Sequence, residues 1–119
     1  MKNTLILGAT TNKDRYAYKA AEQLTKAGHS IIPFGIKKGT VFGKEIINEW
    51  RSFENVDTVT LYVGPDRQNP YFQKIISIQP KRVIFNPGTE NLVFQSMLAK
   101  AKINFEEACT LVLLSLNEY

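Results

Sequence analysis

Strand-like and helix-like segments alternate along this chain of 119 residues. Residues 4–7 form an apolar strand, and a helix follows in which small apolar side chains recur at helical spacing until Gly28. Four further strands are predicted, at residues 30–34, 57–63, 82–85 and 103–105. Parallel strands need crossover connections, and these connections are right-handed. The sequence therefore predicts an α/β fold with a doubly wound parallel sheet of about five strands, in the order 3-2-1-4-5.

The connection between the second and third predicted strands is the least regular part of the chain. Gly39 and Gly43 bracket three residues, and two isoleucines precede Trp50. A short strand or turn followed by a helical turn is expected within residues 36–56. No linker or internal repeat interrupts the pattern, so residues 1–119 are expected to form one domain.

Composition narrows the classes of protein to which the chain can belong. The longest apolar run near the C-terminus, residues 111–114, is far too short to span a membrane, and the first residues lack the organisation of a signal peptide. A single cysteine, Cys109, excludes an internal disulfide and suits a reducing cytoplasm. The net charge of +4 suits an anionic small molecule, although a solvated basic surface gives the same value. We expect a cytoplasmic protein with a small-molecule ligand and no membrane or nucleic-acid partner; a protein partner stays open.

The first strand runs directly into a glycine-led turn with the sequence Gly8-Ala9-Thr10-Thr11-Asn12. Because glycine has no Cβ, backbone amides can approach anionic oxygens closely there. The polar side chains and the positive end of the following helix point to the same place, as in α/β proteins that hold a diphosphate. The other glycines of the dinucleotide fingerprint are absent, and so is an acidic residue after the second strand. A nucleotide site is therefore predicted, but NAD is not the expected ligand.

Two further loops are expected to face this turn. In the predicted strand order the chain reverses direction between the first and fourth strands, and ligands of such sheets bind beyond the carboxyl ends of the strands at that point. The loop after the fourth strand carries turn-forming and phosphate-binding residue types, namely Asn86, Pro87, Gly88 and Glu90. The end of the second strand is expected beside it and carries Gly35, Lys37 and Lys38.

Several of these residues also have a purely structural interpretation. Lys37 and Lys38 could be solvated lysines, but their place after the second strand suits a phosphorylated ribose, where NAD-binding domains use an acidic residue. Residues 86–88 could be a structural turn. Arg15 and Tyr16 could be exposed residues at a helix start, and Tyr16 could equally cover an adenine ring or a pantetheine arm.

No catalytic or metal-binding constellation is visible in the sequence. The only histidine, His29, precedes the second strand and so belongs to the edge of the sheet opposite the predicted site. Cys109 follows Glu106, Glu107 and Ala108; nearby carboxylates raise a thiol pKa, so a buried structural cysteine is favoured. No group of His, Cys and carboxylate residues has metal-ligand spacing. The sequence favours binding over catalysis, with an enzyme that uses NADP or another nucleotide, or a regulatory module, as alternatives.

Three segments, residues 8–16, 33–39 and 86–90, together carry a resemblance to a known family. They resemble the small stand-alone CoA-binding proteins, whose fold is similar to the CoA-binding domain of the succinyl-CoA synthetase α subunit. The resemblance covers essentially the whole chain and implies a three-layer Rossmann-like domain. Lys13 stands where many members have proline, and the catalytic histidine segment of the synthetase has no counterpart.

The resemblance also implies a ligand and a role for each loop. Coenzyme A, or an acyl-CoA, is the implied ligand, held at its diphosphate by Gly8, Ala9 and Thr10. Lys37 or Lys38 would meet the adenosine 3′-phosphate, and residues 86–90 would border the nucleotide or the pantetheine arm. The implied function is that of a CoA carrier, sensor or regulatory module.

Overall fold

The computed structural model describes residues 1–119 and contains a parallel sheet of five strands. The strands lie in the order β2-β1-β5-β6-β7, and every neighbouring pair is parallel. The strands of the sheet are β1 (Thr4–Leu7), β2 (Ile31–Phe34), β5 (Thr58–Leu61), β6 (Arg82–Phe85) and β7 (Asn104–Glu107). The α-helices are α1 (Tyr16–Lys26), α2 (Phe72–Ser77), α3 (Leu92–Lys100) and α4 (Thr110–Ser115). The predicted α/β class and the number of strands are confirmed.

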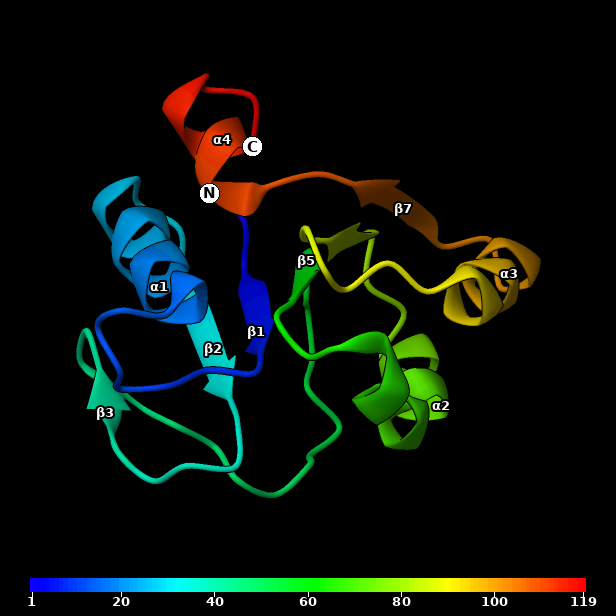
Figure 1. Ribbon diagram of the computed structural model, residues 1–119, viewed down its shortest axis with the longest axis horizontal. Coiled ribbons are helices and arrows are strands. Elements are labelled where there is room, and N and C mark those ends of the chain that lie inside the picture. Colours follow the sequence, from blue (N-terminus) through cyan, green and yellow to red (C-terminus); the bar gives the residue numbers. More distant parts are fainter.

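Helices cover both faces of the sheet, with α1 and α4 on one side and α2 and α3 on the other (Figure 1). The alternation of side chains along β1 produces this division, because Leu5 and Leu7 pack into one buried cluster and Ile6 into the other. Ala17 and Ala21 are buried on the sheet side of α1, where their small side chains allow close packing. The three-layer Rossmann-like architecture follows from this pattern.

The predicted strand order is wrong at one position. The strand after the irregular segment, β5, pairs with β1 rather than with the outer edge of β2. That outer edge is already occupied, because Ile47 N–H donates to Pro33 O at 2.9 Å and Gly35 N–H donates to Ile47 O at 3.0 Å. In order of appearance along the chain the strands therefore lie 2-1-3-4-5, and the chain reverses direction between β1 and β5.

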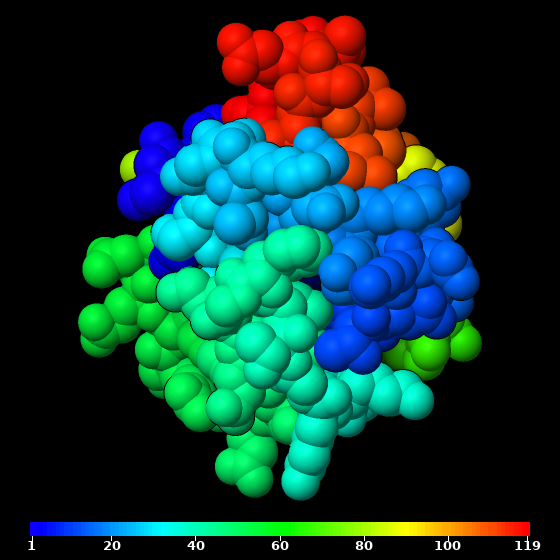
Figure 2. All heavy atoms as spheres, turned by 90° about the vertical axis from the view of Figure 1, so that its left-hand side faces the viewer, coloured from blue at the N-terminus to red at the C-terminus, as the bar shows by residue number.

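The segment between β2 and β5 forms a small hairpin, not the expected helical turn. Its strands are β3 (Thr40–Val41) and β4 (Lys44–Glu45), which pair antiparallel. Val41 and Ile46 are buried against α1, and the ring of Phe42 lies 5.0 Å from that of Tyr18. Figure 2 shows this segment (turquoise) beside the N-terminal turn and α1 (blue). The hairpin thus replaces a crossover helix and forms a wall next to the glycine-led turn.

The fifth predicted strand forms close to its predicted place, and a C-terminal helix follows it. The fifth strand and the C-terminal helix are β7 and α4, and α4 packs beside α1 on the same face of the sheet. Leu114 of α4 packs against the buried cluster below α1. None of the helices combines the length and the apolar character needed to cross a membrane.

Candidate ligand-binding cleft

A cleft of about 630 Å³ lies at the carboxyl ends of β1 and β5. Four loops line it: the β1–α1 turn, the loop after β2, the loop after β5 and the β6–α3 loop. Among the predicted site residues, those that line the cleft are Gly8, Ala9, Thr10, Arg15, Tyr16, Gly35, Lys37, Pro87 and Gly88. The reversal of chain direction between β1 and β5 places the cleft there, as is general for open α/β sheets.

The glycine-led turn is packed so tightly that glycine is needed on both sides of it. Gly8 has a φ of +102°, and a Cβ there would lie 3.0 Å from Tyr62 O. A Cβ at Gly35 would overlap the carbonyl oxygen of Ala9. The N–H groups of Gly8 and Ala9 both donate to Phe34 O, at 2.8 and 2.9 Å. The expectation that these two amides are free to meet an anion is therefore corrected: they fix the turn to β2.

Backbone N–H groups without an acceptor belong to Thr10, the residue after Ala9, and to the start of α1. Arg15, the N-cap residue of α1, makes no side-chain cap, and the first turn of α1 holds no acidic residue. The N–H groups of Thr10, Tyr16 and Ala17 have no acceptor in the protein. All three residues line the cleft. An anion in the cleft would meet unsatisfied N–H groups and the positive end of an 11-residue helix.

The cleft is positively charged. Arg15, Lys37 and Arg67 line it, and Asp14 is the only carboxylate residue in its lining. The ion pairs of the protein are Lys26 with Glu22 and Arg82 with Glu106, so no carboxylate lies within 4.0 Å of the cleft cations. Three cations without a carboxylate partner favour an anionic ligand over a neutral one.

Two predicted residues of the turn lie outside the cleft lining. The methyl group of Thr11 packs against Gly39, where an added Cβ would lie 2.5 Å from it. Asn12 Oδ1 accepts a hydrogen bond from Asp14 N–H at 3.0 Å. Both side chains thus shape the turn and its contact with the hairpin segment. Lys38 also lies outside the lining, in contrast to its neighbour Lys37.

The β6–α3 loop divides into a cleft-lining part and a structural part. Asn86 is buried, donates to Thr60 Oγ1 at 2.7 Å and to Leu61 O at 2.9 Å, and accepts from Thr110 N–H. It therefore joins β5, β6 and α4 rather than lining the cleft. Glu90 accepts a hydrogen bond from Gly88 N–H at 2.9 Å and also lies outside the lining.

One buried amide side chain connects the two loops that follow β5 and β6. Gln68 is fully buried; its Nε2 donates to Val63 O at 2.9 Å and to Thr89 O at 2.7 Å. Asn91 Nδ2 donates to Gln68 Oε1 at 3.1 Å, and Asn91 Oδ1 caps α3 by accepting from Phe94 N–H. This side of the cleft is therefore held by a closed hydrogen-bond network.

The loop after β5 contains no predicted site residue, because the predicted strand order placed that strand at the edge of the sheet, away from the site. From this part of the chain the cleft is lined by Tyr62, Val63, Gly64, Arg67 and Tyr71. Burial raises the pKa of Tyr62 to about 12, and its buried hydroxyl has no hydrogen-bond partner. Pro33 carries the signal that could have corrected the order, because proline is tolerated in edge strands and disfavoured in central ones.

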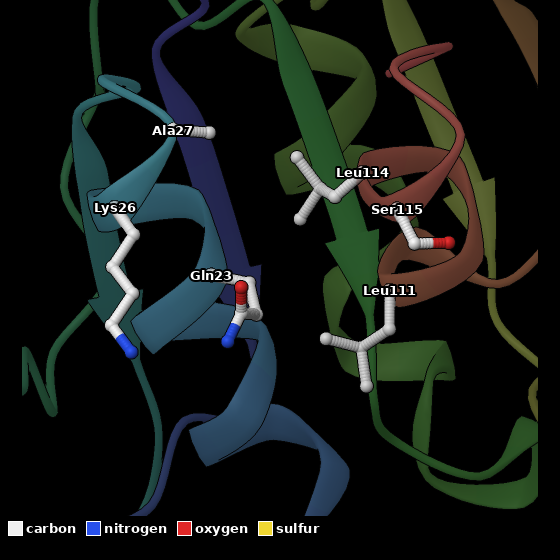
Figure 3. Close-up of a pocket in the computed structure, with 6 residues that line it drawn as sticks. All are labelled: Gln23, Lys26, Ala27, Leu111, Leu114 and Ser115. Carbon is white, nitrogen blue, oxygen red and sulfur yellow. The ribbon is translucent and has the colours of Figure 1, made fainter.

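A second hollow lies between α1 and α4 but has none of these features. Its volume is about 390 Å³, and Gln23 of α1 and Ala27, just after α1, lie across it from Leu111 and Leu114 of α4 (Figure 3). Its one cation, Lys26, lies 3.8 Å from a carboxylate oxygen of Glu22. The first cleft is therefore the candidate site.

The protein's only histidine and its only cysteine lie outside the cleft lining, and Asp14 is the one carboxylate within it. His29 lies at the amino end of the sheet, where its Nδ1 accepts from Lys2 N–H at 2.8 Å, as its sequence position predicts. Cys109 is partly buried at the start of α4. The cleft thus offers cations, N–H groups and aromatic rings.

Comparison with known proteins identifies the family. Residues 2–115 match the family model described as the CoA binding domain. The chain belongs to this CoA-binding family. A crystal structure described only as that of an uncharacterized protein is 54% identical to this CoA-binding domain, covers 100% of this chain and 98% of its own, and has a TM-score of 0.98.

More distant structures share the fold of this CoA-binding domain. Cell-free ID.343 from Thermus thermophilus is 18% identical, with a TM-score of 0.85 over 99% of this chain and 90% of its own. A conserved hypothetical protein from Pyrococcus furiosus is 20% identical, with a TM-score of 0.83 over 94% of this chain and 98% of its own. Among curated proteins, none matches this chain in sequence.

Proposed function

We propose that this protein binds coenzyme A, or an acyl-CoA, in the cleft at the carboxyl ends of β1 and β5. The observation that carries the proposal is the uncapped start of α1, which opens into a cleft with three unpaired cations. A diphosphate would accept hydrogen bonds from the N–H groups of Thr10, Tyr16 and Ala17, and the Arg15 guanidinium would add a charge-assisted contact. Membership of the CoA-binding family supports this choice of ligand.

The other cations and the apolar rim suit the rest of the nucleotide. Lys37 lines the cleft on the β2 side, where a 3′-phosphate on the ribose would find a cation. Ile36 and Tyr16 line the same cleft and are 85% and 68% exposed, so a ligand that covered them would bury apolar surface. The adenine ring or the pantetheine arm would supply that cover.

The role we propose is binding rather than catalysis. A thioester hydrolase or transferase needs a placed nucleophile or base; the cleft lining contains neither histidine nor cysteine, and its one carboxylate, Asp14, is exposed on the β1–α1 turn. The protein would act as a CoA carrier, sensor or regulatory module. Incubation with a panel of acyl-CoAs should release no thiol above the uncatalysed rate; turnover of any acyl-CoA that is lost in a Cys109→Ala or Glu90→Gln variant would make it an enzyme.

Binding is tested by calorimetry with two matched glycine variants. Gly88 and Gly28 have nearly the same φ, +91° and +88°, and a Cβ at either position meets no atom within 4 Å. Only Gly88 lines the cleft. Gly88→Val and Gly28→Val should therefore strain the backbone equally, but only Gly88→Val should weaken CoA binding, by roughly tenfold.

Two results would contradict the proposed function. The first is that the unmodified protein binds NADP stoichiometrically and does not bind CoA, which would select the alternative nucleotide. The second is that both glycine variants bind CoA as tightly as the unmodified protein, which would place the ligand outside this cleft.

A further inference from the structure

Asn48 holds the main chain of the loop that carries Lys37. Its side-chain Nδ2 donates to Gly35 O at 2.7 Å and to Lys37 O at 2.9 Å. An amide NH2 group has two hydrogens, so one is available for each carbonyl. Asn48 lies beyond the β3–β4 hairpin and thus bonds back across the hairpin to the start of the segment between β2 and β5.

The residues around Asn48 are fixed by other contacts, but residues 36–38 are not. Gly35 N–H donates to Ile47 O, and Ile46 N–H donates to Gly39 O at 2.8 Å. Between these two anchors, the bond from Asn48 to Lys37 O is the only hydrogen bond that reaches residues 36–38. Asn48 therefore provides the one hydrogen bond to the backbone between these anchors, and it does so at the residue that lines the cleft.

We propose that Asn48 is a positioning residue, which holds Lys37 rather than Lys38 toward the 3′-phosphate of the ligand. The inference rests on the proposed function, because it needs CoA in the cleft. Lys37 lines the cleft and Lys38 does not, although both are neighbours in sequence. Asn48 is itself exposed, so its loss should release the loop without unfolding the protein.

The experiment compares CoA with dephospho-CoA, which lacks the 3′-phosphate, by titration calorimetry. The unmodified protein should prefer CoA about tenfold or more, as expected for a charge-assisted contact. Lys37→Ala should abolish most of the preference, and Lys38→Ala should keep it. Asn48→Ala should lose most of the preference while binding dephospho-CoA as tightly as the unmodified protein. Asn104→Ala, at an exposed asparagine of β7, serves as the matched control and should change neither affinity.

The double variant separates positioning from a general structural role. If Asn48 acts through Lys37, Asn48→Ala should weaken CoA binding no further once Lys37→Ala is present. Equal weakening of CoA and dephospho-CoA in Asn48→Ala, or additive losses in the double variant, would overturn the inference while leaving CoA binding intact. An unmodified protein that binds both ligands equally would overturn it as well; one that binds neither would also overturn the proposed function.

Discussion

The two ends of the parallel sheet differ in whether their polar groups have partners. At the amino end, Arg82 donates to Thr58 Oγ1 at 3.0 and 3.2 Å, lies 3.7 Å from a carboxylate oxygen of Glu106 and covers the ring of Tyr119 at 4.5 Å. The hydroxyl groups of Thr4 and Tyr119 share a hydrogen bond. Burial raises the pKa of Tyr119, because the charged phenolate would lose its hydration.

At the carboxyl end, Asn86 and Gln68 are also hydrogen-bonded, but the cations of the cleft and the start of α1 have no such partners. Arg15, Lys37 and Arg67 have no carboxylate within 4.0 Å, and the start of α1 has no side-chain cap. The three cations are exposed to solvent, which hydrates them when no ligand is bound, so leaving them unpaired costs little stability. The amino end thus pairs Arg82 within the fold, whereas the carboxyl end keeps N–H donors and cations free to meet a ligand.

The largest expected effect is a loss of folding stability when Arg82, at the amino end, is replaced. Arg82→Ala should lower the free energy of unfolding by about 2 kcal/mol, because it removes charged hydrogen bonds to a buried threonine and the cover of Tyr119. The affinity for CoA should not change. Urea denaturation and calorimetry measure the two quantities. The control is Arg51→Ala, at an exposed arginine without an ion pair, where stability should stay within about 0.5 kcal/mol of the unmodified protein.

At the carboxyl end, a substitution of Arg15 is expected to weaken CoA binding and to leave stability unchanged. Arg15→Ala should lower the affinity for CoA about tenfold, equivalent to about 1.4 kcal/mol, because it removes a cation beside the diphosphate. Its free energy of unfolding should change by less than about 0.5 kcal/mol, since the exposed side chain caps no helix and forms no ion pair. If Arg15→Ala destabilises the protein as much as Arg82→Ala does, the distinction between the ends fails.

A smaller effect concerns the stability of the variant that releases the Lys37 loop. Asn48→Ala should leave the free energy of unfolding within about 0.5 kcal/mol, because Asn48 is exposed and the carbonyls it leaves can bond to water. Gln68→Leu, which removes a buried amide with the same number of donors, should cost about 2 kcal/mol. Equal losses measured by urea denaturation would show that both amides stabilise the fold alike.

The smallest expected effect is a pH dependence at the amino end. Burial, with help from nearby positive charges, lowers the pKa of His29 below its usual 6.5. The unfolded chain then binds the proton more readily, so this contribution to stability is complete above about pH 6.5 and is lost as the pH falls through the folded pKa. His29→Asn, which keeps an acceptor for Lys2 N–H, should flatten the pH dependence of the melting temperature in this range. An unchanged slope would show that another group titrates there.

The layers of the fold could be predicted because they depend on local patterns. Apolar strands, the alanine-rich face of α1 and Gly28 after it all carry their information within a few residues. The strand order could not be obtained in the same way, since it depends on whether Ile47 or β5 occupies the edge of β2. Pro33 favours the observed order, because proline is tolerated in edge strands and β2 lies at the edge of the sheet in that order.

The residues of the candidate site also differ in whether a local sequence pattern could predict their role. The turn residues that line the cleft could be predicted from their residue types. Glycine and threonine before the start of a helix are typical of turns that bind anions. Asn86 has the same residue type as a ligand-binding asparagine, but its partners come from β5 and α4, far away in sequence. Asn48 and Gln68 likewise act through contacts that no local pattern contains.

The most direct test of the central claim is a titration of the isotopically labelled protein with CoA, followed through its backbone amide signals. The largest shifts are expected at the N–H groups of Thr10, Tyr16 and Ala17. A second group is expected at Gly88, and little change is expected at His29 and Arg82. Shifts that cluster at the amino end of the sheet or in the hollow between α1 and α4, or no shifts at all, would contradict the central claim.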